Sequence, residues 1–195
     1  MTSGSQITSI VLAGVGGQGI LLASEITAQT AMLAGFDVKT NEVHGMAQRG
    51  GSVIGQIRYG KKVYSPLVAK GTAKVLIALE QIEALRFSDY LSADGVAVVS
   101  SQAIIPVTVS SGAAKYPQNV KQMLEDVFKK LVFIDAAKIA IEAGNIRAAN
   151  TVLLGAMSNH LDLPIECWQT AIESAVGEKY SELNKKAFSA GRNST

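Results

Sequence analysis

Cysteine and histidine are scarce in this chain of 195 residues, which contains one Cys and two His. An iron–sulfur cluster needs several thiolate ligands, so Cys167 alone cannot hold one. His44 and His160 lie far apart, and neither has a Cys, His or carboxylate partner at a spacing typical of a metal site. We therefore expect this chain to bind no metal and no cluster by itself.

An excess of charge of one sign is also lacking. The 18 Lys and Arg residues nearly balance the 16 Asp and Glu residues, and the formal net charge is +2. Proteins that hold a nucleic-acid backbone concentrate basic residues on one face, whereas the basic doublets here are isolated. We expect no nucleic-acid partner.

Long hydrophobic runs are absent as well. A membrane-spanning helix needs about 20 consecutive apolar residues, and Glu25 with its polar neighbours interrupts the most apolar stretch. Residues 1–6 contain no Lys or Arg and do not resemble a signal peptide. We expect no membrane association and a cytoplasmic location.

What the chain does contain is enough apolar material for a core. Hydrophobic residues make up 48% of the sequence and charged residues 17%, a balance too apolar for a disordered chain. The length suits one domain. We expect residues 1–190 to form a single domain, with a flexible polar end over residues 191–195.

Apolar runs typical of strands alternate with segments of helical periodicity. Strands are predicted over residues 7–13, 36–43, 75–79, 96–99 and 131–134. Helices are predicted over residues 20–34, 80–90, 120–131, 135–144 and 147–160. A further helix is predicted after Pro164, and a last one over residues 178–189. Residues 52–64 are predicted to form an antiparallel hairpin. This order predicts an α/β protein, a three-layer α/β/α sandwich with a mostly parallel but mixed sheet.

A Rossmann-like glycine turn follows the first predicted strand, with the sequence Gly14-Val15-Gly16-Gly17-Gln18-Gly19. It matches G-x-G-x-x-G, in which glycines permit a tight turn and let backbone N–H groups reach an anion at a helix N-terminus. We expect a side chain at position 17 to come too close to the backbone. Glu42 stands where an acidic residue would meet the ribose of a dinucleotide. The same glycines would also suit simple packing of helix on strand, so the turn favours phosphate or subunit contact without identifying the ligand.

A second glycine-rich stretch has the sequence Glu42-Val43-His44-Gly45-Met46-Ala47-Gln48-Arg49-Gly50-Gly51-Ser52. Its glycines free the backbone, so consecutive N–H groups can line an anion site to which Arg49 adds a forked donor. An ordinary loop in which Arg49 caps a helix end or pairs with a surface carboxylate is equally compatible with this sequence. The stretch therefore suits a phosphate or a carboxylate without requiring one.

These two motifs resemble those of the gamma subunit or domain of the 2-oxoacid:ferredoxin oxidoreductases, especially the indolepyruvate branch. A third likeness is Asn150-Thr151-Val152-Leu153-Leu154-Gly155-Ala156, and the resemblance spans most of the chain. It implies a gamma-type α/β/α domain in a complex that oxidatively decarboxylates an arylpyruvate. The complex would join the acyl group to coenzyme A and pass electrons to ferredoxin.

The resemblance also implies a division of cofactors between subunits. Thiamine diphosphate, magnesium and [4Fe-4S] clusters would belong to a large partner subunit, with coenzyme A as co-substrate. The candidate cofactor-binding residues of this chain are then Gly14, Gly16, Gly17, Gln18, Gly19, Glu42, Gln48, Gly50 and Gly51. His44 and Arg49 would face the partner's active site as catalytic candidates. His44 would relay a proton or orient a carboxylate, because imidazole titrates near neutral pH; a loop histidine bonded to the backbone is the alternative.

Two other classes of function stay open from the sequence alone: a free-standing dinucleotide-binding oxidoreductase and a small-ligand binding module. The sequence also leaves open which 2-oxoacid is preferred and whether the isolated chain forms a homodimer. Arg58 and Asn150 are weaker candidates, because a strand-face charge and a helix-end amide explain them equally well.

Overall fold

The computed structural model describes residues 7–45, 50–105, 109, 112 and 115–195, and contains one six-stranded sheet in the order β2-β3-β1-β4-β5-β6. The strands are β1 (Thr8–Val15), β2 (Asp37–His44), β3 (Ser52–Gly60), β4 (Ala73–Ala78), β5 (Leu91–Ser100) and β6 (Leu131–Ile134). β1, β4, β5 and β6 run parallel to one another, whereas β3 is antiparallel to both of its neighbours, β1 and β2. The sheet is therefore mixed, as predicted.

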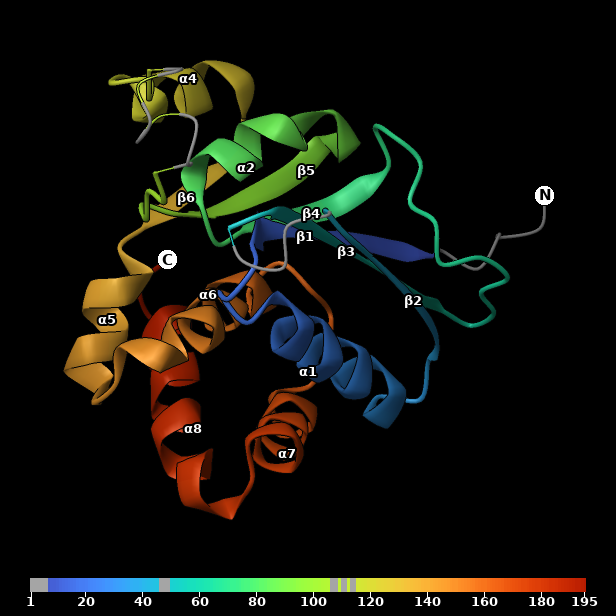
Figure 1. The fold of residues 1–195 in the computed structure, drawn as a ribbon. Helices are drawn as coiled ribbons and strands as arrows, with labels where there is room; N and C mark the ends of the chain where they lie inside the picture. Colours follow the sequence, from blue (N-terminus) through green and yellow to red (C-terminus); the bar gives the residue numbers. More distant parts are fainter. Residues whose placement is uncertain (1–6, 46–49, 106–108, 110–111, 113–114) are drawn as a thin grey trace.

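Helices cover both faces of this sheet (Figure 1). On one face lie α1 (Ile20–Leu33) and α6 (Ala149–Ser158), and α7 (Ile165–Val176), α8 (Glu178–Arg192) and α5 (Ala136–Ala143) pack on them. On the other face lie α2 (Gln81–Arg86) and α4 (Val120–Val127), with 3-10 turns at Ser88–Tyr90 and Ile146–Ala148 elsewhere. The predicted three-layer α/β/α sandwich is confirmed. Within the described residues, no helix is both long and apolar enough to cross a membrane.

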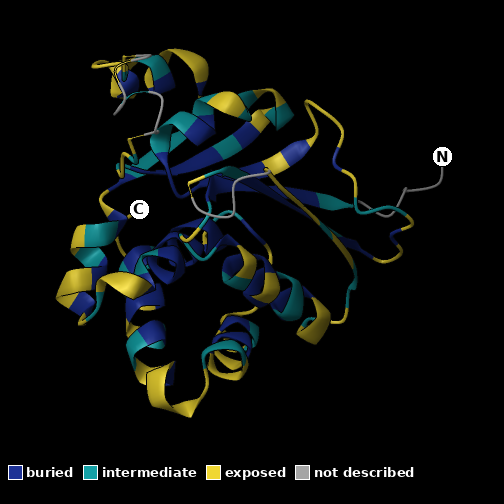
Figure 2. Ribbon diagram, viewed as in Figure 1, coloured by how far each residue is buried: buried dark blue, intermediate teal, exposed yellow. Residues whose placement is uncertain are grey.

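Each face of the sheet buries its own apolar core, and the central strands are buried on both faces (Figure 2). Ile10 and Leu12 of β1 point into the core shared with α1 and α6, while Val11 points into the core shared with α2 and α4. Such double burial explains why β1 and β4 are nearly continuous apolar runs rather than alternating ones. It also fixes the position of the carboxyl end of β1, where the glycine turn begins, beside the carboxyl end of β4.

The predicted hairpin over residues 52–64 is wrong. β3 ends at Gly60, and residues 61–72 contain no strand, because β1 and β2 already occupy both edges of β3. Arg58 instead holds this loop: its Nη1 donates to the carbonyls of Ser65 at 2.9 Å and Leu67 at 3.3 Å. Arg58 therefore has a structural use in the fold.

The last helix, α8, continues to Arg192, into the segment 191–195 for which we predicted a flexible end. The Asn159 amide donates to the Arg192 carbonyl at 2.8 Å and to the Thr195 hydroxyl at 2.6 Å. Gly191 is buried against the backbone of Val152 in α6. A glycine contact of this kind leaves no apolar side chain in the sequence to reveal it.

Candidate functional site

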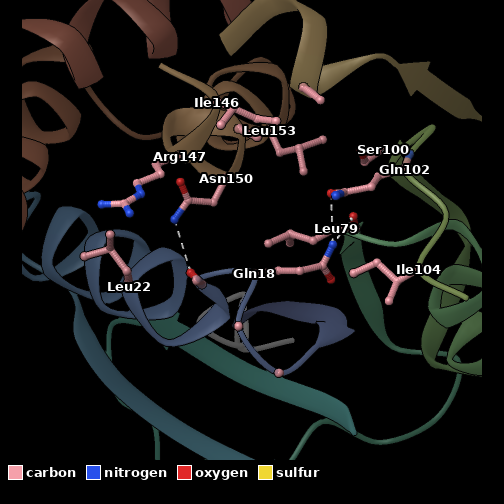
Figure 3. Close-up of a pocket in the computed structure, with 15 residues that line it drawn as sticks. Gln18, Leu22, Leu79, Ser100, Gln102, Ile104, Ile146, Arg147, Asn150 and Leu153 are labelled. Carbon is pink, nitrogen blue, oxygen red and sulfur yellow. Dashed lines mark hydrogen bonds between the residues drawn. The ribbon is translucent and has the colours of Figure 1, made fainter. Parts of the chain in front are cut away.

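The centre of the sheet forms a crevice at the carboxyl ends of β1 and β4. The chain leaves these neighbouring parallel strands toward opposite faces, β1 into α1 and β4 into α2. Ligands of α/β sheets bind where successive connections diverge in this way. A pocket of about 600 Å³ lies there, which we call the glycine-turn pocket (Figure 3). It is lined by Gly16, Gly17, Gln18, Gly19, Leu22, Leu79, Ser100, Gln102, Ile104, Ala137, Ile146, Arg147, Ala149, Asn150 and Leu153.

The glycine turn supplies one wall of this pocket through its backbone. Gly17 and Gly19 have φ of 102° and 80°, which side-chain-bearing residues rarely adopt. Gly19 is the N-cap of α1 and gives the helix no side-chain oxygen. The first N–H groups of a helix lack intrahelical acceptors and lie at the positive end of its dipole. This wall of the pocket is therefore suited to an anion.

The expectation that a side chain at position 17 would come too close to the backbone is wrong. A Cβ at Gly17 would meet no atom within 4 Å, so only its φ excludes other residues. The close contact is at Gly19, where a Cβ would lie 2.7 Å from Nδ2 of Asn150. A Cβ at Gly14 would lie 2.8 Å from Oε1 of Gln18. Gly14 thus serves packing, Gly17 serves the turn, and Gly19 serves both.

Gln18 turns its side chain into the protein rather than away from it (Figure 3). Its Oε1 accepts from the Val15 N–H at 2.8 Å, and its Nε2 donates to the Leu79 carbonyl at 2.8 Å and to Oε1 of Gln102 at 3.1 Å. Gln18 therefore joins the segments that follow β1, β4 and β5.

The opposite wall comes from the start of α6 and the turn before it. Asn150 is 4% exposed, and its Nδ2 donates to the Gly19 carbonyl at 3.2 Å. Arg147 is exposed and is the one charged side chain among the fifteen described residues that line the pocket. From the sequence, Asn150 was only a weak site candidate and Arg147 was not a candidate at all. The one feature that could have indicated Arg147 is its position at the start of a predicted helix, three residues before Asn150.

The other sequence candidates lie in several different places. His44 is exposed at the end of β2 and lines a second, mainly apolar pocket of about 740 Å³ on the other side of the glycine turn, with Gly16, Gly17 and Gly19. The Gly51 carbonyl accepts from the Gly16 N–H at 2.9 Å, so the two glycine-rich motifs meet. Gln48 and Arg49 lie outside the described residues, and Gly50 directly follows them.

Glu42 lies apart from the glycine-turn pocket. It is exposed on β2 at the edge of the sheet, opposite Gly55, and β3 separates β2 from β1. In a dinucleotide site the acidic residue follows the strand next to β1. The topology therefore does not bring Glu42 to a ribose bound at the glycine turn. Among the described residues, no group of three or more His, Cys, Asp or Glu is arranged to hold a metal ion.

Comparison with known proteins gives a consistent family. The profile of the family described as pyruvate ferredoxin/flavodoxin oxidoreductase matches residues 9–194. The indolepyruvate oxidoreductase subunit IorB of Pyrococcus horikoshii is 42% identical over 188 residues, which cover 94% of this chain and 93% of that protein. The same subunit of Archaeoglobus fulgidus is 41% identical, with 95% and 94% covered. The crystal structure of a keto/oxoacid ferredoxin oxidoreductase gamma subunit from Geobacter sulfurreducens superposes with a TM-score of 0.70 at 26% identity, covering 96% of this chain and 97% of that one.

Proposed function

The chain belongs to the pyruvate ferredoxin/flavodoxin oxidoreductase family as a small subunit of a 2-oxoacid:ferredoxin oxidoreductase, and on this premise we propose that it completes an active site held mainly by a large partner subunit. One observation carries the proposal. The glycine-turn pocket is open, and its described lining offers a single charge, Arg147, and no acid–base pair. Such a lining can bind and orient an anion but needs a second surface for chemistry.

The surface around the pocket, at the carboxyl ends of β1 and β4, is suited to contact with another protein. Leu21, Ile105 and Ile146 are between 49% and 54% exposed, and they lie on the three segments that border the two pockets. Exposed apolar side chains gathered around a pocket mark interaction surfaces. We propose that the large subunit binds this surface, over the glycine turn. His44 would then face the large subunit and relay a proton or orient the substrate carboxylate.

The chemistry of the pocket favours a phosphate-bearing ligand. The start of α1 borders it without a side-chain cap, and Arg147 adds a fixed positive charge. We propose that it binds a phosphate group of coenzyme A, the co-substrate of the reaction. Thiamine diphosphate, magnesium and the [4Fe-4S] clusters reside on the large subunit in this proposal, since one Cys cannot ligate a cluster.

The substrate in this proposal is an arylpyruvate, in line with the names of the relatives that cover most of both chains. Thiamine diphosphate supplies the electron sink for decarboxylation when it is bound to the large subunit. The clusters of that subunit would carry the electrons to ferredoxin. The dinucleotide alternative loses support because Glu42 lies away from the glycine-turn pocket.

Replacement of Arg147 by Ala in the assembled enzyme tests the ligand assignment. A charge-assisted contact contributes about 1.5–3 kcal/mol, so KM for coenzyme A should rise by roughly tenfold to a hundredfold, with kcat at saturation little changed. Lys121→Ala, on the exposed surface of α4 across the sheet, is the control. An unchanged KM for coenzyme A in Arg147→Ala would remove this co-substrate from the pocket.

A further inference from the structure

A buried carboxylate beside the site has no part in the chemistry described so far. Glu80 lies two residues after the end of β4 at Ala78 and is only 2% exposed. Burial of a carboxylate is costly unless hydrogen bonds compensate for the lost water. Among the described residues, four donors bond Glu80: its Oε2 accepts from the N–H groups of Ile82 at 2.7 Å and Glu83 at 3.0 Å, and its Oε1 accepts from the Ile104 N–H at 3.2 Å and the Tyr116 hydroxyl at 2.9 Å.

The two oxygens of Glu80 have different tasks. Oε2 caps the start of α2, a role for which Asp, Asn, Ser or Thr would suffice. Oε1 extends to Ile104 and Tyr116, which both belong to the segment that follows β5. The longer side chain of Glu is therefore explained by the second task rather than by the cap.

The same segment is held from the other side by the glycine turn. Gln102 accepts from Nε2 of Gln18 at 3.1 Å, and its carbonyl accepts from the Gln81 N–H at 3.1 Å. Gln102 and Ile104 both line the glycine-turn pocket, as Figure 3 shows. The pocket wall after β5 is thus held between Gln18 on one side and the Glu80 carboxylate on the other.

Tyr116 secures the far end of this arrangement. Burial raises the pKa of Tyr116 to about 12. The Gln81 amide, whose Nε2 donates to the Tyr116 hydroxyl at 3.0 Å, lowers this pKa, whereas the Glu80 carboxylate, which accepts from the hydroxyl, raises it. The hydroxyl therefore keeps its proton and its bond to Glu80 throughout the physiological pH range.

We propose that Glu80 is a positioning residue, which fixes residues 101–105 against the glycine turn and so sets the shape of the pocket wall formed by Gln102 and Ile104. It does not contact the ligand. The inference rests on the proposed function, because the pocket it shapes is the one assigned there to coenzyme A. Its effect should therefore appear in KM for coenzyme A rather than in the chemical step.

Glu80→Asp in the assembled complex separates the two tasks of the side chain. Asp is a good N-cap, so α2 should remain capped, but the shorter side chain cannot reach Ile104 and Tyr116. We expect faster hydrogen exchange at the Ile104 amide and a roughly tenfold higher KM for coenzyme A, with kcat at saturation retained. The matched control is Glu83→Gln: Glu83 is also buried on α2, at 5% exposed, but its carboxylate bonds Ser52 and Arg86 instead.

The outcomes are distinct. Unchanged exchange at Ile104 overturns the proposal, and so does faster exchange with an unchanged KM. A rise in KM that Glu83→Gln reproduces also overturns it, because the effect would then be general to α2. If Glu80→Asp fails to fold, Tyr116→Phe removes only one hydroxyl and should raise KM in the same direction. An effect of Arg147→Ala without any effect of Glu80→Asp defeats the positioning role alone, whereas an unchanged KM in Arg147→Ala defeats the proposed function.

Discussion

Substitution of Gly19 by Ala tests the contact on which the glycine-turn pocket is built. The new Cβ would lie 2.7 Å from Nδ2 of Asn150, inside van der Waals contact. Asn150 can move its amide away only by giving up the 3.2 Å bond to the Gly19 carbonyl. The pocket would lose the link between its two walls.

The size of the effect follows from two contributions. Ala in a left-handed conformation costs about 1–2 kcal/mol, and a buried amide and carbonyl left without partners cost about 1–3 kcal/mol more. Gly17→Ala is the matched control, because Gly17 also has positive φ but no atom lies within 4 Å of its Cβ position. Gly19→Ala should therefore lower the free energy of unfolding by at least about 1 kcal/mol more than Gly17→Ala does.

Thermal unfolding followed by circular dichroism measures the difference, since 1 kcal/mol corresponds to about 2–4 °C in Tm for a chain of this size. The Gly19→Ala, Asn150→Ala double variant completes a thermodynamic cycle, and we expect a coupling energy of about 1 kcal/mol because Asn150→Ala removes the clash. Equal Tm values for the two glycine variants, or additive effects in the cycle, would refute the contact.

Two further predictions concern stability. Gly155→Ala places a Cβ against the Phe188 carbonyl oxygen of α8, so α6 and α8 must separate. This overpacking should lower the free energy of unfolding by about 1–3 kcal/mol, as measured by urea denaturation. Helix propensity alone would instead raise it by about 1 kcal/mol. Burial, and then the charges of Lys130 and Lys74, hold the pKa of His160 below its ordinary value near 6.5. Because this pKa is lower in the folded than in the unfolded state, the neutral imidazole contributes to the free energy of unfolding; the contribution is complete above pH 6.5 and is lost as pH falls through the folded-state pKa. Between pH 7 and pH 5, the Tm of the wild type should therefore fall more than the Tm of His160→Asn. Parallel curves of Tm against pH would contradict this prediction.

Local sequence patterns were sufficient for the architecture. Apolar runs and the glycine turn predict β1, α1 and the alternation that follows, because burial of the central strands requires such runs. The hairpin over residues 52–64 failed for a non-local reason: β1 and β2 occupy both edges of β3, and no single segment contains that information.

The candidate site was predictable only in part, for the same reason. The glycine turn lies within one short segment and could be recognised there. The bond from Asn150 to Gly19 spans 131 positions, and the bond from Glu80 to Tyr116 spans 36. Arg147 stands at the start of a predicted helix, but an exposed Arg at such a place is commonplace, so its position did not single it out. Residues that act across the fold become visible only when the fold brings them together.

The most direct test of the account is turnover by the separated and recombined subunits, with reduction of ferredoxin measured in the presence of an arylpyruvate and coenzyme A. Neither this chain nor the large subunit should reduce ferredoxin alone at the rate of the complex, and mixing them should restore that rate. Full activity of the large subunit without this chain, or turnover by this chain unaided, would contradict the claim that the active site is completed between them.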